Sequence, residues 1–472
     1  MSERDEAGAS ADGPLWGGRF AKPPAAEAEA LSKSLRFDVR LAPQDVEASV
    51  AHVRALEDAG LLTGDEAAAL EKALREVGED VVAGRVAPHP ADEDVHSAIE
   101  REVTDRLGDL GAKLHGGRSR NDLVATDLRL WLLAAGGRIG EGVARLIRVL
   151  VAQARDHVGT VMPGITHGRP AQVVTLGHHL LAHAWALLRD LERMDEWAAR
   201  TSVSPLGAGA LAASTLGLDP DASAARLGFA RAFENSLDAV SDRDFAQEFL
   251  AGTAIAGTHL SRLAADVIRW TDESLGWAAL DEAYATGSSM MPQKRNPDVA
   301  ELVRAKAGRL AGHFVAVSSV LAGLPLGYYR DLQEDKEPLF DGADTLEAAL
   351  AALAGCVETL RFDAPALRRG ADAEALYATD LAEEMVKGGV PFRQAHWRIG
   401  DLLRRLDSEG RSLRDLTAEE WLHVGLADGA RLLDPDRSVR ARSMPGGPSP
   451  QSVLAQADAV DAALAAKRPP AD

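Results

Sequence analysis

DLVATDLRLWLLAAGGRIGEGVARLIRVLVAQARDHV, from Asp122 to Val158, is the longest helical pattern in the chain. Apolar residues recur along it at the spacing of one face of an α-helix, namely at Leu128, Leu132, Ile139, Val143, Leu146 and Leu150. At about 1.5 Å per residue, a helix over the whole stretch is about 55 Å long, far beyond the average for globular proteins. Long helices joined by loops are typical of a bundle, so this stretch predicts one.

Four further segments have the same periodicity. They are expected at Thr175–Arg200, about Asp242–Thr271, from Pro297 through Leu321, and about Asp341–Leu360. Alanine and leucine are abundant whereas β-branched and aromatic residues are scarce, which favours helix over sheet. Because strands do not alternate with helices in the pattern, a doubly wound sheet is not expected. The predicted fold class is all-α.

The 472 residues exceed the size of one ordinary hydrophobic core. Shorter helical stretches precede the long helices, and shorter, more charged helices follow them. We therefore predict three helical domains: an N-terminal domain over 1–119, a central long-helix bundle domain over 120–362 and a C-terminal domain over 363–472. The polar start MSERDEAGASADG and the final AAKRPPAD are expected to be disordered.

The chain is acidic, with 72 Asp and Glu residues against 52 Lys and Arg residues and a net charge of -20. This balance argues against a nucleic-acid partner, since phosphate binding needs a basic face. The single cysteine, Cys356, lies in an apolar pattern and can form no disulfide within the chain, which fits a reducing compartment. The pattern contains neither a signal peptide nor a membrane span, so we predict a cytoplasmic protein without a membrane partner.

One cationic loop stands out in this acidic chain: TGSSMMPQKRNPD, from Thr286 to Asp298. Gly287 and the two serines after it predict a flexible hinge. Lys294 and Arg295 lie just before a predicted helix, whose first turn offers unpaired N–H groups and partial positive charge. The loop is therefore either an anion site or a solvated turn with incidental cations.

Three more loops carry chemically capable side chains. LHGGRSRND, from Leu114 to Asp122, is again cationic, so a ligand bound by both cationic loops should carry at least two negative groups, plausibly carboxylates. MPGITHGRPAQ, from Met162 to Gln172, is expected between two helices and places His167 beside a threonine. His167 is then either a general acid or base, or an ordinary histidine whose hydrogen bonds are made within the protein. YYRDLQEDKE, from Tyr328 to Glu337, is dense in donors and acceptors, which is also typical of a solvated turn.

His179 and His183 have the i, i+4 spacing of a zinc-binding helix. The glutamate of such motifs does not follow His179, and the sequence indicates no third ligand. We therefore expect both histidines to line the bundle.

The quoted loops resemble a known family. GSSMMPQKRNP is similar to the signature of the fumarase/aspartase superfamily, and within it the chain most closely resembles the argininosuccinate lyases. DEDVHSAIE, GRSRNDLVATDLRLW, DRDFAQEFL and DLQEDKE extend the resemblance along the chain. It implies an all-α homotetramer, a central bundle shared between subunits and active sites built from loops of three subunits.

The reaction that this resemblance implies is a carbon–nitrogen lyase reaction of arginine biosynthesis. A small-molecule substrate, argininosuccinate, is reversibly cleaved to L-arginine and fumarate without metal or cofactor. A base removes a weakly acidic proton next to a carboxylate, and cations stabilise the aci-carboxylate dianion that forms.

The resemblance also implies roles for single residues. Ser288 and His167 form the acid–base pair, with the choice of base left open; Lys294 activates the serine, and Glu301 orients the histidine. The positions that match substrate-binding residues are Ser34, Asn121, Thr166, Asn296, Tyr328, Gln333 and Lys336. Supporting contacts are expected from Asp94, Arg118, Arg120 and Arg243.

One departure from the family pattern leaves alternatives open. The family usually has Leu-Gln after the catalytic histidine, whereas this chain has Gly168 and Arg169. The Thr-His-Gly form is closer to adenylosuccinate lyase, which performs the same elimination on a nucleotide. A relative that serves as a non-catalytic structural protein is the remaining alternative, and the joint presence of Ser288, His167 and Lys294 argues against it.

Overall fold

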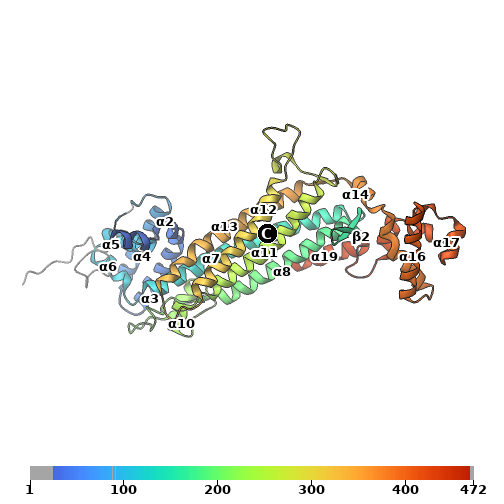
Figure 1. Ribbon diagram of the computed structural model, residues 1–472. Helices are drawn as coiled ribbons and strands as arrows, with labels where there is room; N and C mark the ends of the chain where they lie inside the picture. Colours follow the sequence, from blue (N-terminus) through green and yellow to red (C-terminus); the bar gives the residue numbers. More distant parts are fainter. Residues whose placement is uncertain (1–24, 88, 91, 468–472) are drawn as a thin grey trace, which may run out of the picture. The chain divides into compact units, whose positions relative to one another are not determined.

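The computed structural model describes residues 25–87, 89–90 and 92–467 and confirms the all-α class. Its five longest helices match the five predicted segments: α7 (Arg120–Asp156), α8 (Leu176–Thr201), α11 (Asp244–Trp270), α12 (Asp298–Leu321) and α13 (Lys336–Thr359) (Figure 1). The largest difference is at α13, which begins five residues before the predicted start at Asp341. The predicted N-terminal tail and residues 468–472 lie outside the described residues, whereas 465–467, expected to be disordered, are the end of the last helix.

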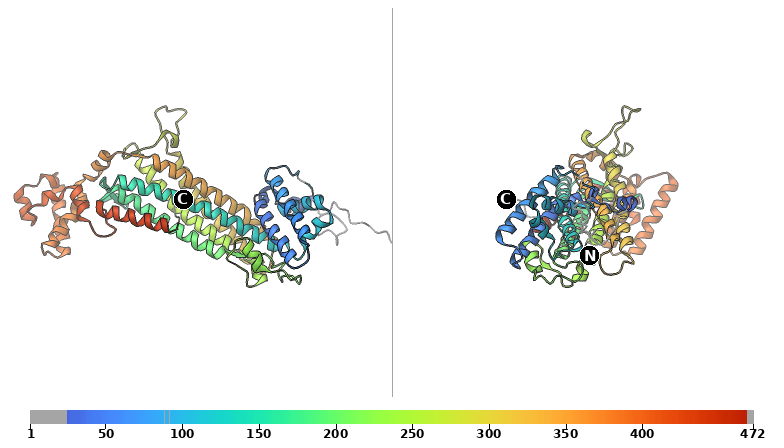
Figure 2. Two further views of the ribbon diagram at one scale, coloured as in Figure 1. Left: turned by 180° about the vertical axis from the view of Figure 1, so that it is seen from behind. Right: turned by 90° about the vertical axis from the view of Figure 1, so that its left-hand side faces the viewer.

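The chain divides into two compact units. The first comprises residues 1–138, 194–253 and 310–344, and the second comprises 139–193, 254–309 and 345–472. Each of the five long helices contributes one segment to each unit, and within a unit these segments lie side by side (Figures 1 and 2). The three-domain division stays a prediction.

The first unit adds short helices to its segments of the long ones. They are α1 (Ala26–Ser32), α2 (Leu35–Asp38), α3 (Ala42–Asp58), α4 (Gly64–Val82), α5 (Val95–Leu107), α6 (Asp109–Ala112), α9 (Pro220–Arg226) and α10 (Ser236–Ser241), with 3-10 turns at Val39–Leu41, Lys113–His115 and Arg330–Asp335. Two short strands, β3 (Val203–Ser204) and β4 (Arg231–Ala232), pair in parallel. The helices α3, α4 and α5 pack against one another. Among the long helices, Trp131 and Phe340 pack edge to face, with ring centroids 4.5 Å apart.

The second unit adds further short elements. Its helices are α14 (Ala364–Ala371), α15 (Ala378–Lys387), α16 (Phe392–Glu409), α17 (Ala418–Val424), α18 (Pro435–Ala441) and α19 (Pro450–Lys467), with 3-10 turns at Glu282–Tyr284, Glu374–Tyr377, Leu413–Asp415 and Gly429–Leu432. Its strands are β1 (Val161–Thr166), β2 (Arg169–Thr175), β5 (Ala278–Ala279) and β6 (Arg361–Phe362), which pair antiparallel as β1–β2 and β5–β6. A core of buried residues, including Tyr377 and Trp421, holds α15, α16 and α17 together. Of the helices described, none is both long and apolar enough to span a membrane.

The prediction of a plain loop around His167 was wrong, because the segment is a β-hairpin. Val161 pairs with Thr175 and Thr166 with Arg169, with an irregularity between Gly164 and Ile165. His167 and Gly168 form a two-residue turn, with φ of 52° and 72°. Positive φ at both residues is the mark of a type I′ hairpin turn, in which glycine is favoured and histidine is tolerated. A proline and a glycine early in β1 masked the strand pattern in the sequence.

Two adjacent glycines of α7 allow a matched test of packing in the first unit. A Cβ on Gly136 would lie 2.4 Å from Cζ3 of Trp197, whose indole is buried and donates a hydrogen bond of 2.7 Å to the Phe245 carbonyl oxygen. A Cβ on Gly137 meets no atom of the described structure within 4 Å. We expect Gly136→Ala to lower the free energy of unfolding by about 1–3 kcal/mol through overpacking. Gly137→Ala should raise it by about 0.5–1 kcal/mol, because alanine favours the helix. Urea unfolding followed by circular dichroism measures both, and equal effects would refute the packing explanation.

Candidate active site

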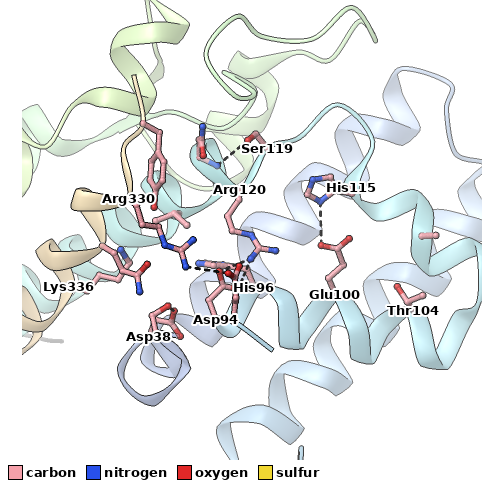
Figure 3. A pocket seen from close by; sticks show the side chains of 17 residues that line it. Asp38, Asp94, His96, Glu100, Thr104, His115, Ser119, Arg120, Arg330 and Lys336 are labelled. Carbon is pink, nitrogen blue, oxygen red and sulfur yellow. Dashed lines mark hydrogen bonds and ion pairs between the residues drawn. The ribbon is translucent and has the colours of Figure 1, made fainter. Parts of the chain in front are cut away.

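The first unit contains a pocket of about 600 Å³ (Figure 3). Most of the side chains that line it are charged or polar: Ser34, Asp38, Glu93, Asp94, His96, Glu100, Thr104, His115, Ser119, Arg120, Asn121, Tyr328, Arg330, Gln333 and Lys336, with Ala112 and Val124. Seven of the nine predicted site residues in this unit line the pocket. The two that do not are Arg118 and Arg243.

Three helices begin at this pocket. Asp94 is the N-cap of α5 and accepts a hydrogen bond of 2.8 Å from the Ser97 N–H. Arg120 is the first residue of α7, and Lys336 is the first residue of α13. At the start of α5, the N–H groups of Val95 and Ser97 already donate to Asp38 and Asp94. The partial positive charge at the starts of α7 and α13 therefore favours an anionic ligand.

Asp94 and Arg120 form an ion pair in the pocket wall. Nη1 of Arg120 donates to both carboxylate oxygens of Asp94, at 2.8 and 2.6 Å. Burial alone would raise the pKa of Asp94, but the charges of His96 and Arg120 and the hydrogen bonds from Ser97 outweigh it and hold the pKa at about 2. The pKa of Arg120 is raised, because the nearby carboxylates outweigh its burial. Both groups are therefore charged at neutral pH.

Asp38 shares the pocket with Asp94 but has a different environment. It accepts hydrogen bonds from Ser34 Oγ at 2.6 Å and from the Val95 N–H at 3.1 Å. Burial nevertheless raises its pKa above the ordinary value. Two carboxyl groups whose pKa values are pushed in opposite directions lie in one pocket, which is a pattern typical of sites that handle protons and charged substrates.

A buried ion cluster holds the ammonium group of Lys336. Asp335 accepts from Lys336 Nζ at 3.1 Å and from Arg243 Nε at 2.7 Å, and all three side chains are almost inaccessible. Arg243 therefore lies behind the pocket and holds Asp335, which in turn holds Lys336 at the surface of the pocket. Removing Asp335 would leave both buried cations without the carboxylate that pairs with them.

The other first-unit residues have defined positions as well. Arg118 is buried behind the pocket and donates to Ser49 Oγ at 2.8 Å. Asn121 Nδ2 donates to the Ala210 carbonyl oxygen at 3.0 Å, and Gln333 Nε2 donates to the Ser32 carbonyl oxygen at 2.9 Å. These contacts orient the amides at the pocket, which Tyr328 also lines.

Sequence reasoning missed several pocket residues. His96 lines the pocket, and its Nδ1 lies 2.5 Å from a carboxylate oxygen of buried Asp45. Glu100 faces His115, at 3.4 Å, and both line the pocket. His96 and Glu100 are four residues apart in DEDVHSAIE, after the Asp94 cap. Placing this motif on one helix face would have found them.

The cationic loop belongs to the second unit, and its two ends are joined in a neck formed by Thr286 and Asn296. Thr286 and Asn296 pair through two backbone hydrogen bonds of 3.2 and 2.8 Å. The side chain of Asn296 donates to the Gly287 carbonyl oxygen at 3.4 Å. The Asn296 side chain, two residues before the start of α12, is therefore part of the neck.

Within the loop, Ser288 accepts two backbone hydrogen bonds. The N–H groups of Met290 and Met291 donate to its Oγ, at 3.3 and 3.1 Å. Lys294 is exposed, and Arg295 pairs with Glu282 at 3.1 Å. Two donors on one hydroxyl oxygen favour its ionised form.

His167 and Thr166 lie at the exposed tip of the β1–β2 hairpin, and Glu301 lies exposed in the first turn of α12. Among the described residues of this chain, no hydrogen bond links Ser288, His167, Lys294 and Glu301 to one another. A non-glycine residue with positive φ is uncommon, so the backbone of His167 marks the tip as a special position.

Comparisons with known proteins indicate one family. Residues 18–312 match a family model described as Lyase, and residues 375–440 match one described as Argininosuccinate lyase C-terminal. An argininosuccinate lyase of Mycobacteroides abscessus is 51% identical, covering 96% of this chain and 97% of that protein. One of Frankia casuarinae is 50% identical, covering 97% and 98%.

Solved structures show the same fold. An EDDS lyase in complex with formate superposes with a TM-score of 0.82 at 29% identity, covering 94% of this chain and 89% of that one. The 3-carboxy-cis,cis-muconate lactonizing enzyme of Pseudomonas putida has a TM-score of 0.74 at 22% identity, covering 93% and 98%. The second likeness concerns the fold alone.

The pKa of Asp94 leads to a test of the pocket wall. Its folded pKa of about 2 is below the ordinary value of 3.8, so ionised Asp94 stabilises the fold above about pH 4, and this stability is lost as pH falls towards 2. We expect Asp94→Asn, which keeps an N-cap side chain, to cost about 2 kcal/mol at pH 7 and progressively less below pH 4. Denaturant unfolding at several pH values measures this difference. Asp105→Asn, on an exposed part of α5, is the control and should change stability by less than about 0.5 kcal/mol. A cost of Asp94→Asn that is independent of pH would contradict the assignment.

Proposed function

The chain belongs to the argininosuccinate lyases of the fumarase/aspartase superfamily, and on this basis we propose that it cleaves argininosuccinate reversibly to L-arginine and fumarate. The observation that carries the proposal is 51% identity to an argininosuccinate lyase over nearly the full length of both chains. The reaction makes the protein a carbon–nitrogen lyase of arginine biosynthesis.

The mixed charge of the first-unit pocket supports this substrate. Argininosuccinate carries three carboxylates together with an ammonium and a guanidino group. Arg330 and Lys336 offer positive charge to carboxylates, and Glu93 offers negative charge to the nitrogen-bearing groups. Arg120 and Asp94 pair with each other in the wall beside them. A pocket for a purely anionic ligand has no need of the acidic side chains.

The surroundings of Ser288 support its role in proton transfer. A free serine hydroxyl is too weak a base to take a proton from carbon, so its alkoxide must be stabilised. Two backbone N–H groups already donate to Oγ, and Lys294 lies in the same cationic loop. We assign Ser288 and His167 as the acid–base pair, Lys294 as the activating cation and Glu301 as a positioning residue for the histidine.

The elimination then proceeds in two steps. A base takes the proton from the carbon next to a carboxylate, and the electron pair moves into that carboxylate to give the aci-carboxylate dianion. The electrons return to form the fumarate double bond, the C–N bond breaks, and the departing guanidino nitrogen takes a proton from the acid. Cations aimed at the dianion stabilise the transition state more than the ground state, and each well-placed donor is worth roughly 10²–10³ in rate.

The remaining assignments concern substrate binding. Ser34, Asn121, Tyr328, Gln333 and Lys336 bind the substrate directly. Asp94 and Arg120 shape the pocket wall, and Arg118 and Arg243 support it from behind. From the second unit, Thr166 and Asn296 are assigned to carboxylate binding beside His167 and Ser288.

We also propose that the enzyme is a cytoplasmic homotetramer with active sites shared between subunits. The helix α12 exposes two large apolar side chains, Leu302 and Val315, to 61% and 60%. Exposed apolar side chains on a long helix fit burial against another subunit. The single cysteine, buried at Cys356, fits a reducing compartment.

The substrate is tested by a fumarate-release assay. The purified protein is incubated separately with argininosuccinate and with adenylosuccinate, and fumarate absorbance is followed. We expect release from argininosuccinate alone. Release from the nucleotide alone would reassign the chain to adenylosuccinate lyase chemistry, and release from neither would favour a non-catalytic relative.

The role of Ser288 is tested by substituting it with alanine and, as a control, by the same substitution at the neighbouring Ser289. Ser288→Ala should lower kcat by at least about 10²-fold, whereas Ser289→Ala, in the same loop, should keep most of the activity. Light scattering should give a tetramer for both variants. Full turnover in Ser288→Ala would contradict the assignment.

Mixing the Ser288→Ala variant with a second inactive variant tests whether active sites are shared between subunits. Ser288→Ala and Asn121→Ala, each inactive alone, should regain part of the activity after subunit exchange, because some sites receive neither substitution. Failure to regain activity, with exchange verified by mass spectrometry, would exclude shared sites.

A further inference from the structure

His179, His183 and Asp266 form a compact cluster in the second unit. The two histidines lie one turn apart on α8, and the aspartate lies on α11. The sequence indicated the zinc-helix spacing of the histidines but no third ligand. The fold supplies that ligand from a position more than eighty residues away.

The ligand atoms already lie close together. Nε2 of His179 is 2.7 Å and Nε2 of His183 is 2.8 Å from the same oxygen of Asp266, Oδ2, and the three ligand atoms all lie within 4.8 Å of one another. Bonds of about 2.0–2.1 Å at tetrahedral angles place ligand atoms about 3.3 Å apart. The two distances from Asp266 to the histidines therefore have to lengthen by only about half an ångström for a zinc ion to bind between them.

The surroundings restrict the histidine rings and leave the cluster partly exposed to solvent. The ring of Trp270 packs edge to face on His179, with centroids 5.3 Å apart. His183 is exposed to 14%, whereas His179 and Asp266 are exposed to 31% and 28%. An ion can thus reach the cluster from solvent and keep a water as its fourth ligand.

We propose that His179, His183 and Asp266 bind one divalent transition-metal ion of the zinc class. Two imidazole nitrogens and one carboxylate oxygen are the ligand set that such ions prefer, whereas magnesium and calcium prefer oxygen alone. The ion joins α8 to α11 within the second unit and takes no part in the elimination. The net charge of -20 favours a cation, and the positive charge of Arg262, which acts on His183, opposes it locally.

Metal binding is tested on the full-length protein without a histidine tag. Co²⁺ is titrated in as a spectroscopic substitute for Zn²⁺, and equilibrium dialysis counts the bound ions. We expect one ion per chain and a visible absorption band that Zn²⁺ removes. At a free Zn²⁺ concentration of 100 times Kd, the folded-to-unfolded ratio should rise about 100-fold.

Substitutions locate the ion. His179→Gln, His183→Gln and Asp266→Asn should each weaken binding by at least about 10-fold. The control is His178→Gln, on the same helix turn, because the His178 imidazole is not in the cluster; it should leave affinity unchanged. Asp266→Asn keeps an oxygen that accepts from both histidines, so it separates loss of metal binding from loss of folding.

Two outcomes would overturn the proposal. One is equal binding by the wild type and the three ligand variants, which would mean that the cluster is joined by hydrogen bonds alone. The other is a crystal grown with Zn²⁺ that shows no anomalous scattering peak between the three ligand atoms. The second measurement needs only the wild-type protein.

Discussion

The first-unit pocket depends on the convergence of three helix starts. An α-helix leaves the N–H groups of its first turn without partners inside the helix, and α5, α7 and α13 bring three such starts to one pocket. Arg120 and Lys336 add full positive charges there, although cations destabilise a helix start. Asp122 in the first turn of α7 and Asp335 just before α13 offset this cost. In this way an acidic chain retains local positive charge at the pocket.

The long helices could be predicted from the sequence because their apolar period repeats over many turns. α7 is an example, since its observed range, Arg120–Asp156, is shifted by two residues from the predicted Asp122–Val158. The β1–β2 hairpin could not be predicted in the same way. Its strands are short, Pro163 and Gly164 interrupt the first of them, and a His-Gly turn is a weaker signal than Asn-Gly. Local pattern therefore predicts long elements better than short ones.

The candidate site, too, could be predicted from the sequence only in part. Motif resemblance indicated residues such as Asn121 and Lys336, which the fold brings to one pocket. It grouped Asp94 and Arg120, which also line the pocket, with Arg118 and Arg243, which lie behind it, as supporting contacts. That distinction depends on the direction of each side chain and on contacts between distant segments. The contact between Asp266 and the two α8 histidines is of the same kind. It joins segments more than eighty residues apart, so no local sequence pattern indicates it.

The backbone pairing of Thr286 with Asn296 has an entropic consequence. It already holds together the two ends of segment 287–295, so a ligand that orders this segment does not bear the cost of bringing those ends together. What remains is the internal freedom of the segment, on the order of 1–2 kcal/mol for each residue that becomes fixed. Affinity for such a ligand therefore rests partly on main-chain atoms that never touch it.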